Sequence, residues 1–105
     1  MPQHAPTSKE DTLLYYVQLI KSRVYAQWII PGSVKSSDTN TIVRVNIKVE
    51  RNGTIKDIQF LHQSENLLLN TSVKDAIINA QPFPAFPKDL SDDFLDITIN
   101  FDPEN

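Results

Sequence analysis

The chain has 105 residues, a net charge of −3 and a pI of about 5.2, with 40% hydrophobic and 22% charged residues. This balance is typical of one small globular domain, and the acidic charge argues against a nucleic-acid surface, which needs clustered basic residues. The absence of cysteine excludes disulfides, thiolate nucleophiles and most zinc sites. No apolar run approaches the roughly 20 residues of a membrane span, and the N-terminus lacks a signal-peptide core. Any membrane anchor is therefore expected outside this sequence.

The N-terminal part of the chain predicts a tail followed by a helix. Residues 1–8 are expected to be a linker or tail, and residues 9–105 a single domain. Ser8, with Asp11 three residues later, resembles a capping box. Apolar residues then recur at helical spacing and predict one buried face: Leu13, Val17, Ile20, Val24 and Trp28. The helix should end before Pro31, because a residue that precedes proline avoids the helical conformation.

The segment TIVRVNIKVE alternates apolar and polar residues, which predicts a half-buried strand. An Asn-Gly pair at residues 52–53 predicts a hairpin to a second strand, TIKDIQFLH. Two registers are open for this hairpin. A two-residue turn places Ile47 opposite Ile58. A bulge in the turn instead places Val49 opposite Ile55 and requires a second irregularity near Lys56.

The second half of the chain predicts a helix, a proline-rich crossover and a last strand. Three residues are candidates to start a helix that runs through VKDAIINA: Asn70, Thr71 and Ser72. The stretch AQPFPAFP ends it, because Pro82 interrupts a helix. Phe83 and Phe86 are expected to pin the crossover to the core, since disordered segments rarely carry large apolar side chains. The closing segment FLDITINFD alternates again and predicts a third strand.

These elements predict an α+β fold of two layers, in the order helix, strand, strand, helix, strand. One apolar face per strand and one apolar stripe per helix place both helices on one face of a three-stranded antiparallel sheet. The last strand can pair with the first strand or extend beyond the second. We favour pairing with the first strand, which gives the strand order 2-1-3 and makes the last strand an edge.

The residue types that carry chemistry are sparse. His4 lies in the tail, and His62 ends a strand and is expected to be half-buried; the two make a weak metal case. The acidic pairs at residues 10–11 and 92–93 are typical of helix-start and loop charges. The two glycines are isolated, so no glycine-rich loop is available for a phosphate. We predict no catalytic, metal-binding or cofactor-binding residue, and no enzyme activity.

The ordered set of motifs resembles a known family. It comprises Trp28-x-x-Pro31, the Asn-Gly hairpin, a loop led by Ser64, a helix ending in PFPAFP and the alternating LDITINF. The combination is similar to the C-terminal domain of the TonB/TolA family of energy transducers over roughly Leu13 to Phe101. Many TonB members begin this domain with a Tyr-Pro pair, whereas this chain has Trp28 and Pro31, which favours the TolA-like branch or a mixed one.

The resemblance implies a location and a function. Members are anchored in the inner membrane by an N-terminal helix, and a linker carries this domain through the periplasm. A proton-driven motor complex energises the transducer. The domain grips a protein partner at the outer membrane or in the periplasm, which is a component of the Tol-Pal system for TolA or the short box of a nutrient transporter for TonB. The rivals are TonB-type coupling and a non-enzymatic secretion or structural module.

The resemblance also implies how the partner binds, which is by adding an extended segment as a strand to the sheet. The predicted edge position of the last strand supports this independently, because unpaired main-chain groups are a template for another strand. The predicted partner-binding residues are Asp96, Ile97, Thr98, Ile99, Asn100 and Phe101. The polar side chains among them are expected to face outward and to contribute on the open face of the sheet.

Overall fold

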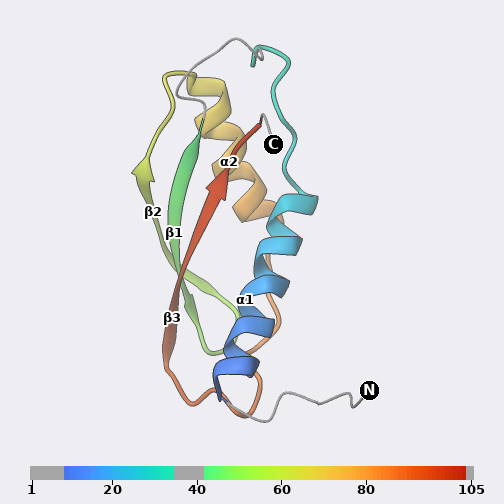
Figure 1. The fold of residues 1–105 in the computed structure, drawn as a ribbon, viewed down its shortest axis with the longest axis vertical. Helices are drawn as coiled ribbons and strands as arrows, with labels where there is room; N and C mark the ends of the chain where they lie inside the picture. Colours follow the sequence, from blue (N-terminus) through green and yellow to red (C-terminus); the bar gives the residue numbers. More distant parts are fainter. Residues whose placement is uncertain (1–8, 35–41, 104–105) are drawn as a thin grey trace.

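A computed structural model describes residues 9–34 and 42–103 of the chain. The predicted tail at residues 1–8, the Ser8 cap and His4 lie outside these residues. The described elements, in chain order, are α1 (Lys9–Ala26), β1 (Val43–Glu50), β2 (Ile55–His62), α2 (Leu67–Asn79) and β3 (Phe94–Phe101) (Figure 1). The strands form one antiparallel sheet in the order β2-β1-β3, and both helices pack on the same side of it. The predicted α+β fold and its 2-1-3 strand order are confirmed.

The core forms where the apolar face of the sheet meets the two helices. Every second residue of β1 is fully buried, and the intervening residues are exposed or half-buried, as the alternation predicts. Removing an aliphatic side chain of this size from water stabilises the fold by roughly 1.5–3 kcal/mol. The sheet and α2 contribute these fully buried side chains: Val43, Val45, Ile47, Val49, Leu69, Val73, Ile77, Ile99 and Phe101.

Helix α1 buries a slightly different stripe from the predicted one. Ile20 and Val24 are fully buried as expected, whereas Leu13 and Val17 are only partly buried. Tyr16 takes the central place, with 1% of its surface exposed. A buried tyrosine needs a hydrogen-bond partner, and the Tyr16 hydroxyl donates to the Pro84 carbonyl oxygen at 2.7 Å. That acceptor lies far along the chain, which is why apolar spacing alone missed this residue.

Helix α2 begins at Leu67, three to five residues before the candidate starts at residues 70–72. The predicted start of this helix is therefore wrong. Asn66 is the N-cap, and its side-chain oxygen accepts hydrogen bonds from the backbone N–H groups of Leu68 and Leu69. Asn70 lies inside the helix and is buried. Its Oδ1 accepts from the backbone N–H and the hydroxyl of Ser64, at 2.9 and 2.8 Å. A tertiary contact therefore satisfies a residue that would otherwise favour a helix end.

The β1–β2 hairpin combines features of both open registers. Val49 pairs with Ile55, as the bulged turn requires, whereas Ile47 pairs with Ile58, as the two-residue turn requires. The pairing shifts between Lys48 and Val49 and again between Arg44 and Val45. The first shift leaves Lys56 without an opposite residue on β1, which is the irregularity expected near that position. The second shift was not predicted.

The proline-rich crossover is packed as predicted. Phe83 and Phe86 are buried, and the Phe86 ring meets the Tyr16 ring edge-on with centroids 5.2 Å apart. The Phe86 backbone N–H donates to the Arg51 carbonyl oxygen at 2.9 Å. The Arg51 guanidinium in turn donates to the Ser91 carbonyl oxygen at 2.6 Å. The crossover is thus tied to both α1 and the hairpin turn, and it delivers the chain to the start of β3.

The buried hydroxyl of Tyr16 predicts a loss of stability at alkaline pH. Burial raises the pKa of Tyr16 to about 12, from 10.0 in the unfolded chain. Because the pKa of Tyr16 is higher in the folded than in the unfolded chain, the stability that its protonated hydroxyl contributes is fully present below pH 10. This stability is lost as the pH rises towards 12. In urea denaturation we expect wild type to exceed Tyr16→Phe by about 1 kcal/mol at pH 7 and this gap to shrink above pH 10. A gap independent of pH would contradict the assignment.

Candidate partner-binding edge

Strand β3 lies at one edge of the sheet, and two hydrogen bonds establish which of its backbone groups point outward. The Arg51 N–H donates to the Asp93 carbonyl oxygen at 3.2 Å, just before β3 begins. Hydrogen-bonded and non-hydrogen-bonded pairs alternate along an antiparallel ladder. Because β1 and β3 pair without a register shift from Glu50↔Phe94 to Val43↔Phe101, the alternation continues along the whole strand. The second hydrogen bond is consistent with this pattern, because the Glu50 N–H donates to the Thr54 carbonyl oxygen on the β2 side and so points away from β3.

The even-numbered residues of β3 therefore carry the outward backbone N–H and C=O groups. They are Phe94, Asp96, Thr98 and Asn100. The odd-numbered residues direct the same groups at β1, and three of them, Ile97, Ile99 and Phe101, also have buried side chains. Of the six predicted partner-binding residues, Asp96, Thr98 and Asn100 therefore direct their main-chain groups away from β1, whereas Ile97, Ile99 and Phe101 direct theirs at it. The main-chain groups of Phe94, which was not among the predicted residues, have the same outward orientation.

The polar side chains on the open face are engaged with β1. The Arg44 Nε donates to the Asn100 Oδ1 at 2.8 Å. Asn46 bridges the other two positions, since its Nδ2 donates to the Asp96 Oδ1 at 3.2 Å and its Oδ1 accepts from the Thr98 hydroxyl at 3.3 Å. These contacts hold β3 against β1. These side-chain oxygens are thus engaged within the sheet, whereas the even-numbered backbone groups of β3 point away from β1.

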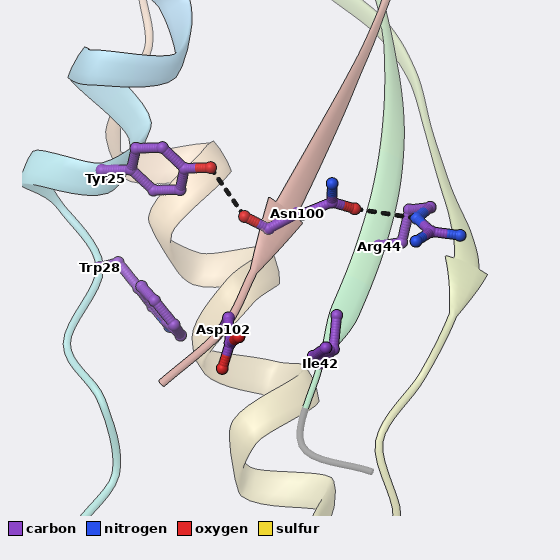
Figure 2. A pocket seen from close by; sticks show the side chains of 6 residues that line it. All are labelled: Tyr25, Trp28, Ile42, Arg44, Asn100 and Asp102. Carbon is purple, nitrogen blue, oxygen red and sulfur yellow. Dashed lines mark hydrogen bonds between the residues drawn. The ribbon is translucent and has the colours of Figure 1, made fainter. Parts of the chain in front are cut away.

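A pocket of about 580 Å³ lies where β3 ends beside α1 (Figure 2). Its lining comes from the end of α1, the start of β1 and the end of β3: Tyr25, Trp28, Ile42, Arg44, Asn100 and Asp102. Trp28 was predicted to be a core residue at the end of the helical stripe. It lies beyond the end of α1 and is only partly buried, with its ring edge-on to Phe101 at 5.1 Å and its Nε1 donating to the Ser72 hydroxyl at 3.0 Å.

Tyr25 is the residue of α1 that reaches the β3 edge. Its hydroxyl donates to the Asn100 backbone carbonyl oxygen at 2.7 Å, and its ring packs edge-on against Phe101 at 5.6 Å. Burial raises the pKa of the Tyr25 hydroxyl. Figure 2 shows the ring on the side of β3 opposite β1. The bond confirms that the Asn100 carbonyl points outward, as the ladder alternation requires.

Comparison with known proteins now places the chain. A family model described as "TonB C terminal" matches residues 14–101. The chain belongs to the TonB C-terminal family. The predicted resemblance is therefore confirmed at the level of the family.

A solved structure shares the fold of this TonB C-terminal domain. It is the solution NMR structure of TolAIII bound to a peptide derived from the N-terminus of TolB. The TM-score is 0.65 at 22% sequence identity, over 100% of this chain and 80% of that one. A search of curated proteins finds no match. At this identity the structural likeness shows a common fold for this TonB-family chain.

The titratable residues of this TonB-family domain are dispersed. Within residues 9–34 and 42–103, no three His, Cys, Asp or Glu side chains are grouped so as to hold a metal ion. His62 is exposed, not half-buried as predicted. Asp93 forms an ion pair with Arg51 at 2.8 Å, which fits the predicted loop charge. Over the same residues, no helix is long and apolar enough to cross a bilayer.

Proposed function

We propose that this domain binds a protein partner by accepting an extended segment as a fourth strand along β3. The observation that carries the proposal is the run of outward backbone groups on a regular edge strand, at Phe94, Asp96 and Thr98. Strand addition uses main-chain hydrogen bonds for affinity. Each such bond contributes roughly 0.5–1.5 kcal/mol net, while ordering the partner costs about 1–2 kcal/mol per residue. Binding of this kind is modest and reversible.

Such binding suits a transducer that engages and releases its partner. We propose that the domain is the periplasmic, non-enzymatic end of a TolA-like transducer, joined to an inner-membrane anchor and a proton-driven motor complex by chain beyond this sequence. Its partner would be an extended segment of a Tol-Pal component. Membership of the TonB C-terminal family supports a transducer, and the likeness to a TolAIII structure holding a TolB peptide supports this kind of partner.

TonB-type coupling to outer-membrane transporters is the second candidate, because the matching family model is the TonB C terminal. Amide-shift titration of the labelled domain with two sets of peptides separates the candidates. One set comes from the N-terminus of TolB and the other from the short boxes of transporters. Either set should perturb β3 most and fade across β2. Perturbations centred on the 52–53 turn or on α1, with β3 unchanged, would refute strand addition.

Thr98→Pro is expected to weaken peptide binding roughly tenfold while leaving the domain folded. Proline removes an N–H donor, and the Thr98 amide points away from β1, so the ladder of the domain itself keeps its bonds. Thr98→Val is the matched control, because it removes the hydroxyl bonded to Asn46 but keeps the amide. Isothermal titration calorimetry and urea denaturation measure the two effects. Equal affinities for both variants would show that the backbone of this edge does not bind the peptide.

A further inference from the structure

The edge proposed to bind a partner is already occupied at one point by the protein itself. The outward carbonyl of Asn100 accepts a hydrogen bond from the Tyr25 hydroxyl at 2.7 Å. A strand added along β3 would require this acceptor once it reached Asn100. The tyrosine ring also stands in the space beside the strand, on the side away from β1 (Figure 2). Tyr25 and an added strand therefore compete for the same end of the edge.

Core packing does not account for this hydroxyl. The Tyr25 ring packs edge-on against Phe101, and 43% of the residue is exposed, so this tyrosine is not a core residue. Tyr16 differs, because it is 1% exposed and its hydroxyl needs an internal acceptor. Proteins commonly cover the unpaired groups of an edge strand to prevent unwanted pairing. Tyr25 covers the last outward acceptor of β3 in this way.

We propose that Tyr25 is a latch that sets the length of the partner-binding edge. With the latch closed, an added strand pairs with Phe94 to Thr98 and stops there. A partner segment that pairs as far as Asn100 must first displace the Tyr25 hydroxyl, which lowers its affinity. Beyond the latch, such a segment would reach the pocket lined by Trp28, Ile42 and Asp102. The inference rests on the proposed strand addition, and it selects for short extended partner segments.

The test compares Tyr25→Phe with wild type and with Tyr15→Phe. The first variant keeps the ring on Phe101 and removes only the donor. The control removes the hydroxyl of a tyrosine on the same helix that is 61% exposed. The probe is a synthetic peptide derived from the N-terminus of TolB, titrated by calorimetry and by amide shifts. We expect Tyr25→Phe to bind about threefold to tenfold tighter, the equivalent of one net hydrogen bond, and its shift footprint to extend from Thr98 to Asn100. Tyr15→Phe should match wild type.

Two results would overturn the latch. Equal affinity and footprint in Tyr25→Phe and wild type would show that the hydroxyl does not compete, and weaker binding would show that it contacts the partner. If no peptide perturbs β3 in any variant, the proposed function fails. The hydrogen bond of the latch is then tested in the free protein. The Asn100 carbonyl carbon shift, read from a triple-resonance spectrum, must then change in Tyr25→Phe and stay constant in Tyr15→Phe. An unchanged shift refutes the latch on its own.

Discussion

Replacing Gly53 with alanine is expected to lower the free energy of unfolding by about 2–5 kcal/mol. Gly53 has φ = +92°, a conformation that L side chains rarely adopt, and leaving the right-handed regions costs roughly 1–2 kcal/mol. An added Cβ would also press on the Phe83 carbonyl oxygen and lie 2.9 Å from its carbon and 3.0 Å from the Pro84 oxygen. These are backbone atoms that no side-chain rotation can move, and overpacking of this kind costs about 1–3 kcal/mol.

Gly32→Ala is the matched control for this prediction. A Cβ at Gly32 meets no heavy atom within 4 Å, so the same chemical change should leave stability nearly unchanged. Urea denaturation with linear extrapolation measures both variants. A Gly53→Ala midpoint equal to that of wild type would mean that the hairpin turn does not rest on the proline-rich crossover.

Phe83→Ala is expected to lower both stability and partner affinity. Phe83 is 3% exposed, and truncating a buried phenylalanine typically costs about 3–5 kcal/mol. Its backbone supports the turn at Gly53. From there the hydrogen bonds of Arg51 lead to Phe86 and to Asp93, which precedes β3. Loosening the crossover is therefore expected to displace the point at which β3, the proposed binding strand, joins the sheet.

Phe94→Ala is the stability control for Phe83→Ala, because it also removes a phenylalanine ring but one that lies outside the core. Phe94 is 43% exposed, with the ammonium groups of Lys48 and Lys56 5.7 and 5.3 Å from its ring centroid, so its truncation should cost about 1 kcal/mol or less. Thermal unfolding of both variants gives the comparison of stability, and peptide titration of Phe83→Ala gives its affinity. A Phe83→Ala protein with full stability and no binding would contradict the geometric role and place this ring in direct contact with the partner.

The alternation of apolar and polar residues predicted most of the sheet, because burial of one face of a strand requires an apolar side chain at every second residue. The alternation in β1 and β3 predicted their inward faces, and the favoured pairing of the last strand with the first predicted the edge position of β3. The start of α2 was mispredicted because Asn66 and Asn70 are equally good caps in isolation. Only the contact between Asn70 and Ser64 decides between them, and Ser64 lies in the preceding loop.

The sequence predicted which strand forms the candidate site, but not which of its backbone groups point outward or which side chains bond to them. Whether the odd-numbered or the even-numbered residues of β3 point their backbone groups outward depends on which residue pairs with β1 are hydrogen-bonded. The three-dimensional structure shows this through the bond from the Arg51 N–H to the Asp93 carbonyl oxygen. Tyr25 is separated from Asn100 by 75 positions, and a tyrosine on a half-exposed helix face carries no local signal of such a bond. Tyr16 was missed for the same reason.

The two edges of the sheet are not equivalent templates. β2 carries two register irregularities against β1, at Lys48/Val49 and at Arg44/Val45, and such bulges twist an edge and interrupt the even spacing that another strand needs. β3 pairs with β1 without a break. A domain with a single regular edge accepts one strand and offers no second surface for growth. The proposed strand addition is therefore expected to stop at one-to-one stoichiometry instead of propagating into a filament.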